Sequence, residues 1–159
     1  MNARSRAVIG ARLVDGVMVV MVVAGILKAF DITVFAQSLA TWSLLPNASR
    51  PVLAVGIPAL EIGLSLAWFM GVWRRLALSC TVLLLSAFTL AYIAHLVLAE
   101  APECACFGLL TLMSKSIVES RMLIVRNVVL ISVLVAAAVL LHKSSRNRDD
   151  SPTNLRRPV

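Results

Sequence analysis

Residues 76–98 read LALSCTVLLLSAFTLAYIAHLVL, the longest uninterrupted apolar run of the chain. The run contains no proline, no glycine and no lysine, arginine or acidic residue. A helix of about 20 apolar residues crosses the roughly 30 Å hydrocarbon core of a bilayer. The run therefore predicts a transmembrane helix.

Three further apolar runs lie on either side of this one, at about residues 13–30, 52–70 and 122–141. The 159-residue chain is 60% hydrophobic and 14% charged, whereas soluble domains are about 45–50% apolar and about 25% charged. This composition excludes a soluble domain. We predict an all-α integral membrane protein, a four-transmembrane-helix bundle that occupies residues 13–141.

The formal net charge is +7, and ten of the fifteen lysine and arginine residues lie at the two ends of the chain and in one short loop. The basic residues gather in an N-terminal segment, residues 1–12, at Arg74 and Arg75, and in a tail, residues 142–159, that we expect to be disordered. In a four-span bundle these three places share one side of the membrane, and the positive-inside rule makes that side cytoplasmic. We predict a multi-pass protein of the bacterial cytoplasmic (inner) membrane with both termini in the cytoplasm. Nucleic acid is not an expected partner; membrane lipid is.

The first connection, residues 31–51, contains a short apolar pattern. Phe35, Leu39 and Trp42 recur at positions i, i+4 and i+7, which is the spacing of one face of a helix. We predict a short helix lying in the membrane interface.

The second connection, residues 100–121, contains the motif Cys104-Ala105-Cys106-Phe107-Gly108. The predicted topology places it on the outer face, where disulfides form and persist in bacteria. A bond between cysteines two positions apart closes a very small ring, and strained, exposed disulfides are easily reduced. The pair is therefore a candidate for catalytic thiol chemistry. A static disulfide that pins the loop is the alternative, whereas a zinc site is not predicted because the connection holds no further cysteine or histidine.

Ionisable residues inside the predicted spans are the other candidates. Glu61 lies near the middle of the second span, where an ionised carboxylate is costly unless it is paired. Lys28, near the outer end of the first span, is a possible partner, but it could equally extend its ammonium to the interface. Glu61 could also be a structural hydrogen-bonding group.

Two residues close to the outer face complete the candidate site. His95 precedes Cys104 by about 13 Å if the chain is helical throughout, so it is a candidate proton acceptor or quinone ligand; the alternative is a packed, hydrogen-bonded histidine. Arg126 opens the fourth span, where its charge would favour a nearby thiolate or satisfy Glu61. Anchoring at the interface would explain Arg126 as well.

Taken together, these residues resemble the MauE (methylamine utilisation) family of membrane proteins, within the wider DoxX-like superfamily. The resemblance covers roughly residues 13–141 and is carried by Lys28 with Phe30-Asp31, Phe35, Leu44-Leu45-Pro46, Pro58 with Glu61, Gly71, Trp73-Arg74-Arg75, the Cys104–Gly108 motif and Arg126-Asn127. It implies a role in disulfide formation or thiol transfer outside the cytoplasmic membrane, typically alongside a thioredoxin-like partner.

Two functional hypotheses follow. In the first, the chain is a thiol:disulfide oxidoreductase: Cys104 and Cys106 exchange electrons with an extracytoplasmic thioredoxin-like protein, a quinone is the candidate membrane carrier, and His95 or Glu61 handles protons. In the second, it is a non-catalytic membrane subunit that stabilises or matures a larger respiratory or redox complex.

The predicted topology can be tested by labelling. A membrane-impermeant maleimide added to intact cells after mild reduction should modify Cys104 and Cys106, because both thiols would face the exterior. Mass spectrometry of the labelled protein measures this. Labelling that requires permeabilised cells would contradict the orientation.

Overall fold

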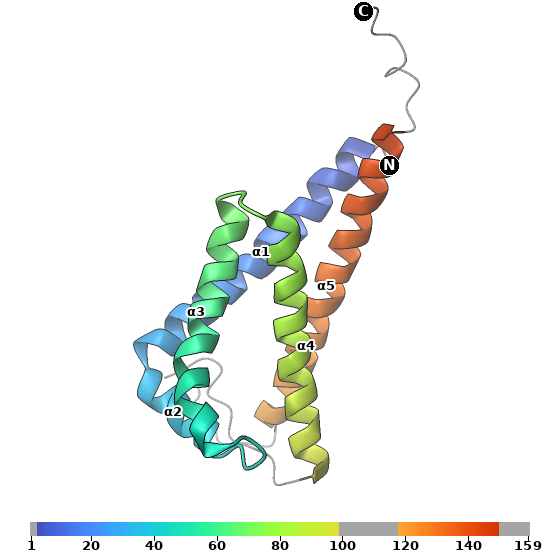
Figure 1. Cartoon of the computed structure of the whole chain (residues 1–159). Coiled ribbons are helices and arrows are strands. Elements are labelled where there is room, and N and C mark those ends of the chain that lie inside the picture. The colour runs from blue at the N-terminus through green and yellow to red at the C-terminus, as the bar shows by residue number, and fades with distance from the viewer. Residues whose placement is uncertain (1–2, 99–117, 150–159) are drawn as a thin grey trace, which may run out of the picture.

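The computed structural model describes residues 3–98 and 118–149. Its elements are α1 (Ala3–Phe30), α2 (Ile32–Ala40), the short 3₁₀ helix η1 (Asn47–Ser49), α3 (Arg50–Phe69), α4 (Arg74–Leu98) and α5 (Val118–Asp149). Figure 1 shows these helices along the length of the bundle. The motif Cys104–Gly108 lies outside the described residues.

Four helices are long and apolar enough to cross a membrane. The apolar segments are Arg4–Phe30, Asn47–Phe69, Arg74–Leu98 and Ile124–Lys143. A helix pairs all of its own backbone groups, which is why runs of this length fold as helices in hydrocarbon. The predicted all-α, four-span architecture is confirmed, and the chain is a multi-pass membrane protein.

Local sequence explains where α3 begins and ends. Pro51 lies in the first turn of α3, where its missing N–H has no intrahelical partner to lose. Pro58 lies inside the helix and is buried there. After Phe69 the chain reverses through Gly71, at φ +77°, and Trp73, at φ +49°. Glycine adopts such left-handed conformations without steric cost.

The four spans form a ring. α1 packs against α3 and α5, and α4 packs against the same two helices, while α2 covers part of α3. Each span contributes a large buried side chain to the central core: Met18 from α1, Trp68 from α3, Leu85 from α4 and Leu134 from α5.

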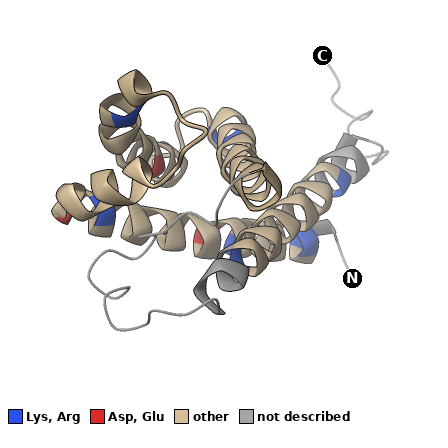
Figure 2. Ribbon diagram, turned by 90° about the horizontal axis from the view of Figure 1, so that it is seen from below, with Lys and Arg blue, Asp and Glu red and all other residues tan. Residues whose placement is uncertain are grey.

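The two ends of the bundle differ in character. Figure 1 shows the start of α1, the α3–α4 turn and the end of α5 at one end, and α2 at the other. The basic N-terminal segment, Arg74 and Arg75 therefore share an end, as the predicted topology requires. Figure 2, seen from the α2 end, shows how sparse Lys, Arg, Asp and Glu are along the spans. Which end faces the cytoplasm remains a prediction.

The predicted helix in the first connection is present as α2, and its apolar face packs against protein. Phe35 and Leu39 are buried against Ala54 and Ile57 of α3. Trp42 follows α2 and is buried against α4. Packing of these side chains against the bundle ties the connection to α3 and α4.

The ends of the chain contain more helix than we expected. α1 begins at Ala3, and α5 continues to Asp149. The expectation of disorder over residues 142–159 is therefore wrong for 142–149; residues 150–159 lie outside the described part. No proline or glycine stands between Leu141 and Asp149 to stop the helix. Basic residues near a helix C-terminus also interact favourably with its dipole.

The α1–α3 contact generates a prediction about Gly25. A Cβ added there would lie 2.9 Å from Ile62 Cγ1, 3.0 Å from Glu61 Cβ and 3.2 Å from the Pro58 carbonyl oxygen. We expect Gly25→Ala to lower the free energy of unfolding by about 1–3 kcal/mol, because the two backbones must separate. Titration of the detergent-solubilised protein with a denaturing detergent, followed by circular dichroism, measures the loss.

Gly16→Ala is the matched control on the same helix. A Cβ at Gly16 meets nothing within 4 Å, so this variant should be neutral or gain up to about 1 kcal/mol from reduced backbone entropy. Equal effects at the two glycines would contradict close α1–α3 packing.

Candidate functional site

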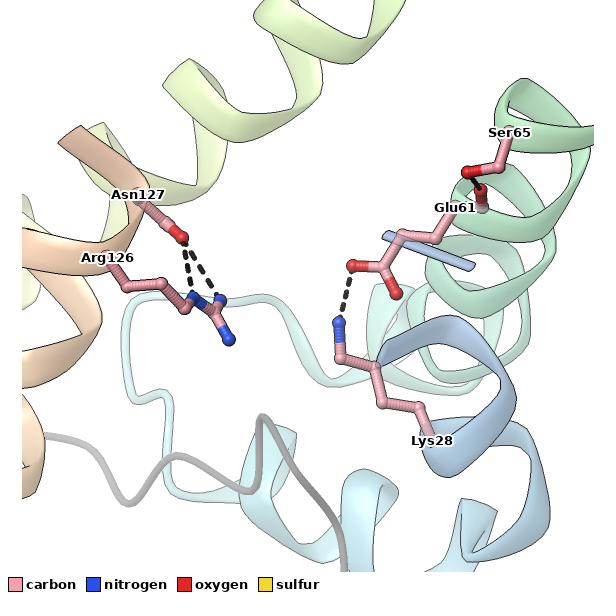
Figure 3. A network of polar contacts seen from close by, with 5 residues as sticks. All are labelled: Lys28, Glu61, Ser65, Arg126 and Asn127. Atoms are coloured by element: carbon pink, nitrogen blue, oxygen red, sulfur yellow. Dashed lines mark hydrogen bonds and ion pairs between the residues drawn. The ribbon is translucent and has the colours of Figure 1, made fainter. Parts of the chain in front are cut away.

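A buried ion pair joins α1 to α3. Lys28, in the last turn of α1, donates a 2.5 Å hydrogen bond from Nζ to Oε1 of Glu61 on α3. Lys28 is 3% exposed and Glu61 6% exposed. Figure 3 shows the two side chains meeting between their helices. Lys28 therefore pairs with Glu61 instead of extending to the interface, which decides between the two alternatives open at this position.

Two aromatic rings and one hydroxyl group lie close to the pair. The Lys28 ammonium lies 5.5 Å from the centre of the Phe35 ring and 5.9 Å from that of Phe88, within the range of cation–π attraction. Ser65 Oγ donates to the backbone oxygen of Glu61, at 2.7 Å. The second carboxylate oxygen, Glu61 Oε2, is buried and has no hydrogen-bond partner among the described residues.

A second polar group links α5 to α4. Arg126 donates from Nε and from one terminal nitrogen to Asn127 Oδ1, at 3.2 and 3.0 Å. Asn127 Nδ2 lies 3.3 Å from Thr89 Oγ1, to which it donates. Figure 3 shows the Arg126 guanidinium and the Lys28–Glu61 pair extending toward the same interior region. Thr89 directly follows Phe88, so adjacent residues of α4 contact the two polar groups.

His95 connects α4 to the chain that follows α2. The Leu44 N–H donates to Nε2 at 3.1 Å, and Nδ1 lies 2.9 Å from the Ala91 carbonyl oxygen. Because a backbone N–H can only donate, Nε2 is the acceptor, and the ring proton belongs on Nδ1 in a neutral imidazole. Trp42 packs edge-on against the ring, with centroids 4.8 Å apart. These are the contacts of a structural histidine; its role in proton transfer stays a prediction.

The predicted site residues therefore divide into three groups. Lys28 and Glu61 are brought together, Arg126 occupies a neighbouring polar group, and His95 anchors the connection after α2. Cys104 and Cys106 lie outside the described residues. Within residues 3–98 and 118–149, no group of three or more metal-ligating side chains could hold an ion.

Sequence reasoning missed one interhelical contact near the other end of the bundle. Asp15 accepts a 2.9 Å hydrogen bond from Trp68 Nε1, which joins α1 to α3 a second time. Asp15 also contacts Arg12, at 4.0 Å on the surface. A tryptophan late in an apolar span was the available signal, since a buried indole N–H usually finds a partner.

The fold and the site together define a class: a small multi-pass helical membrane protein whose interior holds a buried ion pair. The model of the family described as methylamine utilisation protein MauE matches residues 6–141. The chain therefore belongs to the MauE family, as its motifs suggested. Searches of curated proteins and of solved structures found no match.

The ion pair generates a prediction about stability. Lys28→Met leaves the Glu61 carboxylate buried without its cation, so the free energy of unfolding should fall by about 3–5 kcal/mol. The double variant Lys28→Met/Glu61→Met should recover much of this loss, because no unpaired charge remains. Detergent-denaturation curves of the wild type, both single variants and the double variant measure the coupling.

The exposed Arg12–Asp15 pair supplies the control. Arg12 is 82% exposed in this contact, so Arg12→Ala should cost no more than about 1 kcal/mol. Additive effects of the Lys28 and Glu61 substitutions would contradict a direct pairing.

Proposed function

We propose that this MauE-family protein is a thiol:disulfide redox protein of the bacterial cytoplasmic membrane. Cys104 and Cys106 would exchange electrons with an extracytoplasmic thioredoxin-like protein. The observation that carries the proposal is the Cys104-Ala105-Cys106 motif itself, in the segment that joins Leu98 of α4 to Val118 of α5. Membership of the MauE family supports a redox-associated role in the membrane.

The arrangement of the bundle supports the proposed side of action. The last turn of α4, where the cysteine segment begins, lies at the α2 end, opposite the end that carries Arg74 and Arg75. With the basic end in the cytoplasm, the cysteine segment begins at the outer surface. This is where a bacterial thiol pair meets oxidised partners.

The exchange reaction needs only the two cysteines and the partner disulfide. The thiolate of one cysteine attacks a partner sulfur, which forms a mixed disulfide and releases the second partner sulfur as a thiolate. The other cysteine then attacks the mixed disulfide. The products are a Cys104–Cys106 disulfide and a reduced partner, and two electrons have moved to the partner. The reverse sequence oxidises the partner.

The charged residues of the bundle have proposed supporting roles. Arg126, on the first described part of α5, would favour the thiolate form of a cysteine close to it. Glu61 would exchange protons in the interior, where it is held by Lys28. His95 is the weaker candidate for proton transfer because both of its ring nitrogens are already hydrogen-bonded.

The second candidate function is a non-catalytic membrane subunit that stabilises or matures a larger redox complex. The observation that favours it is the extent of purely structural contact near the α2 end. Trp42, Tyr92 and His95 form a packed aromatic group there. In this function the cysteines would form a permanent bond.

Trapping a mixed disulfide distinguishes the two functions. In cells that carry Cys106→Ala or Cys104→Ala, the variant that retains the attacking cysteine should accumulate a covalent adduct, since no resolving thiol remains. Non-reducing electrophoresis followed by mass spectrometry identifies the attached protein. The expected partner is thioredoxin-like, and reduction should release it.

Two control variants complete the experiment. The double variant Cys104→Ser/Cys106→Ser should give no adduct. Cys80→Ala should behave as the wild type, because Cys80 is a free, half-buried cysteine on α4. No adduct from either single variant, together with full activity of the double variant, would favour the scaffold.

A further inference from the structure

The Lys28–Glu61 pair has hydrogen-bonding capacity that the described protein does not use. Glu61 Oε2 is buried without a partner in that part of the chain. Lys28 carries three N–H donors, and among the described residues it donates a hydrogen bond to Glu61 Oε1. An unpaired buried acceptor costs free energy, so an acceptor and spare donors that lie side by side point to a bound group that completes them.

The neighbouring polar side chains form hydrogen bonds to groups other than Glu61 Oε2. The Ser65 hydroxyl donates to the Glu61 backbone oxygen, and the Thr89 hydroxyl donates to the Leu85 carbonyl oxygen, at 2.8 Å. Asn127 donates to Thr89. None of these hydrogen bonds supplies a donor to Glu61 Oε2, so we look for the missing donor in a bound molecule.

The surroundings restrict the chemistry of that molecule. The pair lies among helices that are apolar enough to span a membrane, and the rings of Phe35 and Phe88 flank the ammonium. A sugar, a nucleotide or a peptide would bring more polar groups into this place than Lys28 and Glu61 could satisfy. A flat apolar ring with an oxygen that alternates between carbonyl and hydroxyl matches the available groups. Its hydroxyl can donate to Glu61 Oε2, and its carbonyl can accept from Lys28 Nζ.

We propose that the Lys28–Glu61 pair binds the ring oxygen of a lipid-soluble quinone and of its quinol. The binding site is inferred from the ion pair alone. The role of the bound quinone as electron acceptor rests on the proposed thiol exchange. Oxidation of a dithiol to a disulfide releases two electrons and two protons, and reduction of a quinone to a quinol takes up two of each. The two electrons and two protons released by the thiols are therefore those that the quinone takes up, and the products are the Cys104–Cys106 disulfide and the quinol.

Binding of both redox forms to the full-length protein tests the proposal. The probes are a decyl-substituted benzoquinone and its quinol, titrated into the detergent-solubilised protein and measured by calorimetry. Glu61→Gln replaces one carboxylate oxygen with an amide NH₂ that cannot accept a hydrogen bond. The substitution should weaken quinol binding on the order of tenfold or more. Quinone binding should change much less, because the amide can donate to a carbonyl.

Two controls separate the site from the thiol function. Asp15→Asn changes a different carboxylate, one that joins α1 to α3 through its hydrogen bond with Trp68. This variant should bind the quinone and the quinol as the wild type does. Cys104→Ser/Cys106→Ser should bind both probes as the wild type does. Failure of the thiol proposal would then appear in the trapping experiment while quinol binding persists.

A second measurement uses the wild-type protein and does not depend on the folding of a variant. Dicyclohexylcarbodiimide modifies carboxyl groups in apolar surroundings, so Glu61 should react, either as an acylurea or as a crosslink to Lys28. Peptide mass spectrometry should show that the quinol protects Glu61. The proposal is overturned if the wild type binds neither probe, if Glu61→Gln binds both probes as the wild type does, or if the quinol does not protect Glu61. Bound water would then be the partner of Glu61 Oε2.

Discussion

The ion pair between Lys28 and Glu61 is the constraint on which the rest of the structure depends. A carboxylate or an ammonium alone in the interior of a membrane bundle is strongly unfavourable, whereas the two together are tolerated. The pair therefore requires the end of α1 to lie beside the middle of α3. Gly25 permits this contact, because its missing side chain lets the two backbones approach closely.

The other polar contacts fix the remaining helices around this pair. Trp68 donates to Asp15 and joins α3 to α1 near the end that carries the α3–α4 turn. Asn127 donates to Thr89 and joins α5 to α4. Leu44 donates to His95 and joins the chain after α2 to α4. Apolar packing alone would allow the helices to slide or rotate, since lipid is as apolar as leucine. Hydrogen bonds at several depths of the bundle fix how the helices are shifted and rotated relative to one another.

This organisation assigns the cysteine motif and the buried ion pair to different parts of a small protein. The cysteines belong to a segment that begins at one end of the bundle, and the ion pair lies inside it. In the proposed function, thiol exchange takes place at the surface with a protein partner, and proton and electron transfer to a lipid-soluble acceptor takes place in the interior. His95 then serves to position the connection after α2, since both of its nitrogens are used.

The sequence by itself determined the four spans, the helix around Phe35 and Leu39, and the MauE family motifs. These features depend on local composition and periodicity, which the bilayer converts directly into helices. It also named Lys28 as a partner for Glu61 but left the ammonium free to reach the interface. Only the tertiary structure decided that choice, and only it revealed the Trp68–Asp15 contact and the helical extension of α5 to Asp149. The reason is that such pairings depend on how helices far apart in the chain rotate and pack, whereas each helix forms from its own residues.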